Sequence, residues 1–172
     1  PALSFVATAN AVVLAGAIPH FVDVSEGTWG IDPEALRKLL NGRFRTDGGR
    51  LVNQDTGRTV SAVIPMHTLG HPCDANAIRG IADRYALAMV EDAAESLGSY
   101  LGGEHTGSVG HAGVFSFNGN KTITTGGGGA VVTNDTELAA RMRHLSTTAK
   151  IPHRFEFVHD DAGLNYRMPN IN

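Results

Sequence analysis

The residue of this sequence best placed for chemistry is Lys121, which follows the strand-like run 113–117 through the polar turn 118–120. A lysine that leaves a strand through such a turn can present its amine to a ligand, although most lysines are simply solvated at the surface. A phosphate-binding loop of the G-x-x-x-x-G-K-[ST] type does not fit. Asn120 precedes the lysine, and a strand instead of a helix is expected after it.

Carboxylates form the second candidate group. Glu91, Asp92 and Glu95 come directly after the run 87–90, which is almost entirely apolar, as parallel strands buried on both faces tend to be. A carboxylate at the end of a buried strand is costly unless it meets a cation, a metal or hydrogen-bond donors. The same residues could instead cap a following helix, so their position alone leaves both interpretations open.

Pyridoxal phosphate is the cofactor that accounts for Lys121, Asp92 and Ser116 together. It needs a lysine for a Schiff base and a carboxylate opposite its pyridinium nitrogen, and it also needs donors around its phosphate. A nicotinamide cofactor is disfavoured because the glycines at 126–129 precede a strand instead of following one. No metal site is expected, since His67 and His71 have no third metal-type ligand nearby.

The elements that must position these residues alternate between strand-like and helical patterns. Apolar runs predict strands at 3–6, 20–24, 60–65, 87–91, 113–117 and 130–133, and periodic patterns predict helices at 8–16, 32–41, 74–85 and 135–145. Strands separated by helices of this length predict an α/β fold with a largely parallel sheet, where ligands gather at the carboxyl ends of the strands. The polar, turn-rich segment 42–59 interrupts the alternation and is predicted to be a surface hairpin.

Composition limits the class of protein. The chain has 172 residues, of which 42% are hydrophobic and 18% charged, with a net charge of −3. These values exclude general disorder and a dominant nucleic-acid-binding surface. The single cysteine, Cys73, excludes an intrachain disulfide. No apolar run approaches the roughly 18 residues of a membrane span, and no signal peptide is recognised at the start. The first and last residues both suggest an excerpt of a longer protein.

Four ordered segments together resemble the pyridoxal-phosphate-dependent sugar-nucleotide aminotransferases of the DegT/DnrJ/StrS type. The segments are 1–10, 91–99, 113–129 and 163–168. The resemblance covers essentially the whole chain. It implies fold type I, a three-layer αβα sandwich around a mostly parallel mixed sheet. Residues 1–172 would then form most of the cofactor-binding large domain, without an N-terminal segment and a C-terminal small domain.

The resemblance implies a role for each matching position. Lys121 matches the Schiff-base lysine, and Asp92 matches the carboxylate that keeps the pyridine nitrogen protonated. Glu95 lies near the phenolic oxygen of the ring, where many members have glutamine. Three further residues match cofactor contacts: Ser116 at the phosphate, Phe5 stacked on the ring, and Asn165 reaching the phosphate from the partner subunit.

The implied activity moves an amino group, with L-glutamate as the expected donor, to a 4-keto nucleotide sugar. Within the family, the segments 66–72, 42–59 and 147–153 are most similar to the branch of the legionaminic acid pathway. The resemblance also implies a cytoplasmic homodimer with shared active sites. One alternative is a sugar dehydratase, but those enzymes have histidine in place of Lys121. Another is a non-catalytic regulator on the same scaffold, which the retained site residues disfavour.

Overall fold

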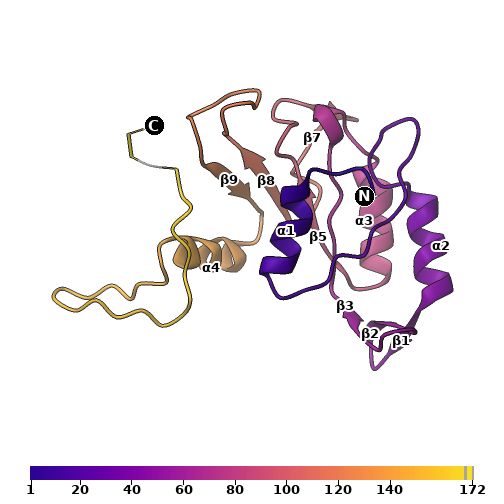
Figure 1. Ribbon diagram of the computed structural model, residues 1–172, viewed down its shortest axis with the longest axis horizontal. Coiled ribbons are helices and arrows are strands. Elements are labelled where there is room, and N and C mark those ends of the chain that lie inside the picture. Colours follow the sequence, from indigo (N-terminus) through magenta and orange to yellow (C-terminus); the bar gives the residue numbers. More distant parts are fainter. Residues whose placement is uncertain (169, 172) are drawn as a thin grey trace.

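The computed structural model describes residues 1–168 and 170–171, and its centre is a four-stranded sheet (Figure 1). The strands lie side by side in the order β4 (Ala62–Val63), β5 (Ala88–Asp92), β8 (Ala112–Ser116) and β9 (Gly129–Val132). β4, β5 and β8 are parallel, whereas β9 is antiparallel to β8. The prediction of an α/β fold with a mixed, mainly parallel sheet is confirmed.

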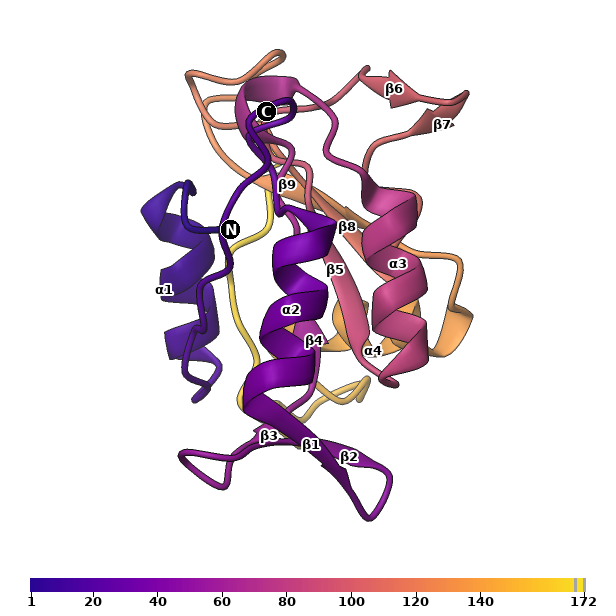
Figure 2. The ribbon, with the colours of Figure 1, turned by 90° about the vertical axis from the view of Figure 1, so that its right-hand side faces the viewer.

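Helices lie on both sides of this sheet (Figure 2). α3 (Ala75–Arg84) packs against β5 and against α2 (Pro33–Arg43), while α1 (Val6–Leu14) lies toward the opposite face (Figures 1 and 2). The hydrophobic core fills the space between α2, α3 and the sheet. Its large aliphatic members include Leu36, Leu40, Ile78, Ile81 and Met89. This arrangement gives the helix–sheet–helix layering that the sequence predicts.

Three helices, at the positions that the helical patterns predict, begin directly after an aspartate whose side chain caps them. The Asp32 carboxylate accepts the N–H of Glu34 at the start of α2, and Pro33 occupies the first turn. Asp74 caps α3 in the same way, and Asp135 caps α4 (Thr136–Ser146). Such caps satisfy backbone donors that have no partner inside the helix. Their sequence signals are therefore reliable because the interaction is local.

Two predicted strands are wrong. Residues 3–5 belong to no strand, and α1 begins earlier than predicted, at Val6, with Phe5 as its N-cap. The run 20–24 contains only an isolated bridge, from Val24 to Ile31. The Ala2 N–H, just before the first of these segments, donates to the Val22 carbonyl of the second. A strand needs a neighbour with a continuous ladder, and neither segment has one in the described part of the chain.

The predicted hairpin at 42–59 is confirmed, and the structure adds a third strand to it. β1 (Phe44–Asp47), β2 (Arg50–Asn53) and β3 (Thr59–Val60) form an antiparallel three-stranded sheet at one end of the molecule (Figure 2). Gly48 and Gly49 both have positive φ in the turn, which glycine adopts at little cost. Phe44 and Leu51 are buried and belong to the main core. The insertion is therefore anchored to the domain and is not a free loop.

Two further segments project from the layers. β6 (Tyr100–Leu101) and β7 (Glu104–His105) form a short hairpin within the chain segment that connects β5 to β8. After α4, residues 147–162 form an exposed arm in which Lys150 and His159 make an antiparallel bridge (Figure 1). Within the described residues, no helix combines the length and the apolar character needed to cross a membrane.

Candidate active site

Two predicted site residues stand at the carboxyl ends of neighbouring parallel strands. Asp92 is the last residue of β5, and Ser116 is the last residue of β8. The register pairs Asp92 with Val114, so Ser116 lies two residues further along the adjacent strand. Ligand sites of α/β sheets form outside such carboxyl ends. The topology thus brings both residues to the edge where a site is expected.

The Asp92 carboxylate is half-buried and is held by two donors. The Thr8 hydroxyl of α1 donates to Oδ2 at 2.5 Å, and the Ala94 N–H donates to Oδ1 at 3.1 Å. The sequence predicts that the helix begins at Thr8, but Phe5 is its N-cap and Thr8 lies within α1. Thr8 instead orients the carboxylate of another element. Only the fold could reveal this contact, since 84 residues separate the two.

Lys121 lies against a carboxylate and an aromatic ring. Its Nζ is 3.4 Å from Glu95 Oε1 and 5.8 Å from the centroid of the Phe5 ring. The turn after β8 holds the lysine in place, because the Lys121 N–H donates to the Asn118 carbonyl. Only 12% of the Lys121 side chain and 22% of the Glu95 side chain are exposed. Three predicted site residues from distant parts of the chain therefore meet around one amine.

The second oxygen of Glu95 is also engaged. It accepts the N–H of Leu69 at 2.9 Å, within the single 3-10 turn η1 (Thr68–Gly70). Leu69 has a φ of 53°, a left-handed conformation that is unfavourable for a residue with a Cβ. The carboxylate of Glu95 thus links Lys121 to a strained turn of the segment that follows β4. The sequence offers no signal for this contact.

Ser116 and Asn165 stand apart from these contacts. The Ser116 hydroxyl accepts the Asn118 N–H at 3.3 Å, which orients it toward the same turn that holds Lys121. Asn165 is exposed, and among the described residues its side chain forms no hydrogen bond. The predicted roles of Ser116 at the phosphate and of Asn165 across a subunit interface both remain predictions.

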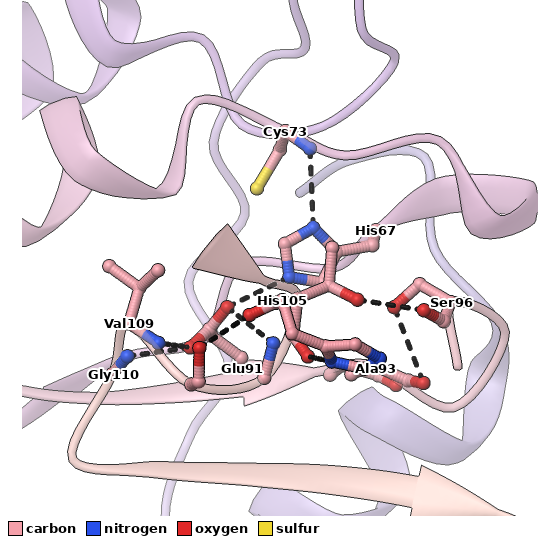
Figure 3. A network of polar contacts seen from close by, with 12 residues as sticks. His67, Cys73, Glu91, Ala93, Ser96, His105, Val109 and Gly110 are labelled. Carbon is pink, nitrogen blue, oxygen red and sulfur yellow. Dashed lines mark hydrogen bonds and ion pairs between the residues drawn. The ribbon is translucent and has the colours of Figure 1, made fainter. Parts of the chain in front are cut away.

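A buried polar network lies beneath the site (Figure 3). The Glu91 carboxylate is fully buried and accepts hydrogen bonds from His67 Nε2 and from the N–H groups of Gly107, Val109 and Gly110. Burial alone would raise the pKa of Glu91, but these hydrogen bonds, led by that of His67, outweigh it and hold the pKa below its ordinary value. The requirement that a buried carboxylate find donors is thus met.

Cys73 contributes packing and not a reactive thiol. Its side chain is fully buried, and burial together with the nearby charge of Glu91 raises the pKa of the thiol to about 12. A thiol with so high a pKa forms almost no thiolate near neutral pH. In the part of the chain that the structure describes, no group of three or more His, Cys, Asp and Glu side chains could hold a metal ion.

The side chains at the sheet edge have the chemistry that pyridoxal phosphate requires. A lysine amine can condense with its aldehyde, a half-buried carboxylate can pair with its pyridine nitrogen, and an aromatic side chain can cover its ring. Lys121, Asp92 and Phe5 offer these groups from three different elements. Fold and site together are those expected of an α/β domain that binds such a cofactor.

Comparison with known proteins narrows this class. The model of the DegT/DnrJ/EryC1/StrS aminotransferase family matches residues 1–172. The chain is 38% identical over 168 residues to the pyridoxal phosphate-dependent aminotransferase EpsN of Bacillus subtilis, covering 98% of this chain and 40% of EpsN. It is 39% identical over 171 residues to the GDP-perosamine synthase of Caulobacter vibrioides, covering 99% and 42% respectively.

A solved structure agrees with these sequence matches. The DegT DnrJ EryC1 StrS aminotransferase from Brucella abortus superimposes with a TM-score of 0.84 at 33% identity, covering 97% of this chain and 42% of that one. The chain belongs to the DegT/DnrJ/EryC1/StrS aminotransferase family. It spans about 40% of the length of these curated relatives. Pyridoxal phosphate, the cofactor that the sequence predicts, is confirmed for the family.

Proposed function

We propose that the protein containing this chain is a pyridoxal-phosphate-dependent aminotransferase that moves an amino group from L-glutamate to a 4-keto nucleotide sugar. The observation that carries the proposal is the amine of Lys121, which lies 3.4 Å from Glu95 and within 6 Å of the Phe5 ring. The name of GDP-perosamine synthase supports a nucleotide-sugar substrate. Assignment to the legionaminic acid branch, like the cytoplasmic location, stays a prediction from the sequence.

Each side chain has a separate task in this proposal. Lys121 would hold the cofactor through its Nζ, and the same amine would carry the proton to and from the α-carbon of the amino donor. The bound cofactor supplies an electron-accepting ring that stabilises the negative charge left when that proton departs. Asp92 holds the proton at the pyridine nitrogen, and the Thr8 hydroxyl keeps its carboxylate oriented. Glu95 balances the charge of the lysine ammonium before the cofactor binds.

Phe5 and Ser116 hold the cofactor without taking part in proton transfer. The Phe5 ring is exposed beside Lys121, so it can cover one face of a flat ring. Ser116 stands at the end of β8, where its hydroxyl can donate to a phosphate oxygen. We propose that residues 1–172 supply most of the large domain around this site. Asn165 would complete the phosphate contacts of a second subunit.

The lysine assignment can be tested directly by finding which lysine the cofactor labels; this chain contains three, at 38, 121 and 150. The full-length protein is loaded with pyridoxal phosphate and reduced with borohydride, and the labelled peptide is identified by mass spectrometry. We expect the label on Lys121. Lys121→Ala and Lys121→Arg should lose both label and glutamate turnover, although arginine preserves the charge beside Glu95. Lys38→Ala, at an exposed position on α2, is the matched control and should retain both.

The substrate assignment needs a separate experiment. The full-length enzyme is supplied with L-glutamate and a panel of 4-keto UDP- and GDP-sugars, and formation of amino sugar is measured. Turnover of at least one member supports the proposed acceptor class. Labelling of Lys121 with turnover of keto acids alone would retain the aminotransferase and reject the nucleotide sugar.

A further inference from the structure

The carboxylate of Glu91 has every acceptor position filled (Figure 3). Oε2 accepts from His67 Nε2 at 2.9 Å and from the Gly107 N–H at 2.9 Å. Oε1 accepts from the Val109 N–H at 2.7 Å and from the Gly110 N–H at 2.5 Å. An ionised carboxylate offers about four such positions. The surroundings of Glu91 therefore suit an ionised carboxylate and do not suit an amide of the same shape.

The partner histidine has a defined tautomer. His67 is 1% exposed, and its Nδ1 accepts the backbone N–H of Cys73 at 3.2 Å. An accepting Nδ1 carries no proton, so the proton of the neutral ring is on Nε2 and is donated to Glu91. The ring cannot reverse these roles, because a proton on Nδ1 would face the N–H of Cys73. Glu91 and His67 thus form a buried pair with one permitted hydrogen-bond pattern.

The segment carrying His67 is bonded directly to the backbone of Asp92. The His67 N–H donates to the Asp92 carbonyl at 3.0 Å, and the Asp92 N–H donates to the Pro65 carbonyl at 2.8 Å. Asp92 follows Glu91 on β5. Displacement of the His67 ring therefore moves the peptide that carries the Asp92 side chain.

The same segment also holds Glu95. Two residues beyond His67, the Leu69 N–H donates to Glu95 Oε2, and the Gly70 carbonyl accepts the Ser99 hydroxyl at 2.7 Å. Gly70 has a φ of 82°, and a Cβ there would lie 2.8 Å from the Glu95 carbonyl. The segment thus packs tightly along residues 95–99, and the His67 side chain anchors its start.

We infer that Glu91 and His67 are a positioning pair, which sets the places of both carboxylates of the candidate site, Asp92 and Glu95. The pair touches neither the cofactor nor the substrate in this proposal, and it acts through the segment 65–70 and the strand end. The inference rests on the proposed function only in assigning Asp92 and Glu95 their roles at the cofactor. The buried network itself is independent of that function.

The test compares Glu91→Gln with two variants of His67 in the full-length protein. A glutamine amide must direct its NH2 group at one of the two donor pairs, so at least two buried donors lose their acceptor. His67→Leu removes the link altogether. His67→Gln can still donate to Glu91 and accept from Cys73, and it should rescue most of the loss. Leu36→Ala, which opens the core beneath α2, is the control for general destabilisation.

Three measurements are made on each variant. They are deuterium uptake of the amides at 107–110 without cofactor, the dissociation constant for pyridoxal phosphate, and kcat and KM for glutamate. We expect Glu91→Gln and His67→Leu to increase the uptake. We expect each to weaken cofactor binding and to lower kcat by about tenfold or more, since an unpaired buried donor is costly. Leu36→Ala should lower the melting temperature without weakening cofactor binding.

Asp92→Asn separates failure of this inference from failure of the proposed function. If Asp92→Asn lowers kcat but Glu91→Gln and His67→Leu match Leu36→Ala in cofactor affinity and kcat, the pair is only structural and the inference is wrong. If Asp92→Asn leaves kcat unchanged, the proposed function of Asp92 is wrong instead. Unchanged uptake at 107–110 in both pair variants would also overturn the inference, whatever the activity.

Discussion

Adjacent carboxylates on β5 have different surroundings at the scale of single residues. Side chains alternate between the two faces of a strand, so Glu91 and Asp92 point in opposite directions. Glu91 is enclosed and accepts four hydrogen bonds, whereas Asp92 accepts two from the residues that the structure describes, Thr8 and Ala94. Because a carboxylate can accept about four, Asp92 retains capacity for a bound group. This difference fits a structural role for Glu91 and the proposed cofactor-binding role of Asp92.

The buried charge of Glu91 predicts an acid-dependent loss of stability. Its pKa in the folded protein is below the ordinary value of 4.5, so folding favours the ionised form. The stabilisation is present in full above pH 4.5 and is lost as the pH falls through the lowered pKa, because the protonated form cannot accept all four bonds. Urea unfolding at a series of acid pH values should show stability falling in that window.

Glu91→Gln is the control for this pH effect. The variant is less stable at neutral pH, but its stability should depend less steeply on pH below 4.5 than that of the wild type. Asp160 and Asp161 also have lowered pKa values, and they add slope of the same sign to both proteins. The comparison therefore uses the difference between the two slopes. Equal slopes would show that Glu91 does not titrate in this window.

At the scale of elements, the arm at 147–162 is joined to α4 by a histidine hydrogen bond and an ion pair. His144 Nε2 lies 2.6 Å from Asp160 Oδ1, and Arg141 pairs with Asp161. The hydrogen bond from His144 is the largest cause that holds the pKa of Asp160 below its ordinary value. Ala149 at the base of the arm is fully buried, whereas residues 151–160 are exposed. The arm is therefore attached at its base and along one side of a helix.

Removal of both side chains should release the arm without unfolding the domain. We expect the double variant Arg141→Ala, His144→Ala to increase deuterium uptake across 150–160, with no change in α3. Added salt should have the same effect on the wild type, because it screens exposed ion pairs. Arg143→Ala is the matched control on the same helix, since its side chain forms no ion pair among the described residues. Equal uptake in the double variant and this control would contradict the anchoring role.

At the scale of the whole molecule, much apolar surface is left uncovered. No residue of α1 is buried, although most of the helix is apolar. The exposed large side chains also include several toward the end of the chain, namely Phe155, Phe157, Leu164 and Tyr166. Large exposed apolar patches mark interaction surfaces. The chain spans about 40% of its curated relatives, so both the rest of the protein and a second subunit are candidates to cover this surface.

A homodimer with shared sites predicts complementation between two inactive variants. Lys121→Ala and Asn165→Ala are made in the full-length protein and mixed under conditions of subunit exchange. If Asn165 acts across the interface, each mixed dimer has one site with both lesions and one with neither, as a two-fold interface requires. Aminotransferase activity should therefore reappear in the mixture.

Two controls accompany this experiment. Lys121→Ala mixed with wild-type protein measures the effect of exchange alone. The double variant Lys121→Ala, Asn165→Ala mixed with Lys121→Ala should remain inactive, because neither subunit supplies Lys121. Full activity of Asn165→Ala by itself, or a monomer at the assay concentration, would reject the shared site.

Local patterns in the sequence determined much of the fold. The helical patterns at 32–41, 74–85 and 135–145, the turn-rich segment 42–59 and the apolar run before Glu91 each depend on neighbouring residues alone. They predicted three helices, the hairpin insertion and the strand that ends at Asp92. The strands predicted at 3–6 and 20–24 failed because pairing depends on a distant neighbour, which no local pattern specifies.

Tertiary structure alone decided which partners the site residues have. The sequence singled out Lys121, Asp92 and Ser116 by residue type and by position after strands. It could not show that Glu95 pairs with Lys121, that Thr8 holds Asp92, or that Glu91 and His67 form a buried pair. These contacts join residues 24 to 84 positions apart. Their formation depends on the order and direction of strands in the sheet, because only the assembled sheet brings those strand ends and loops together.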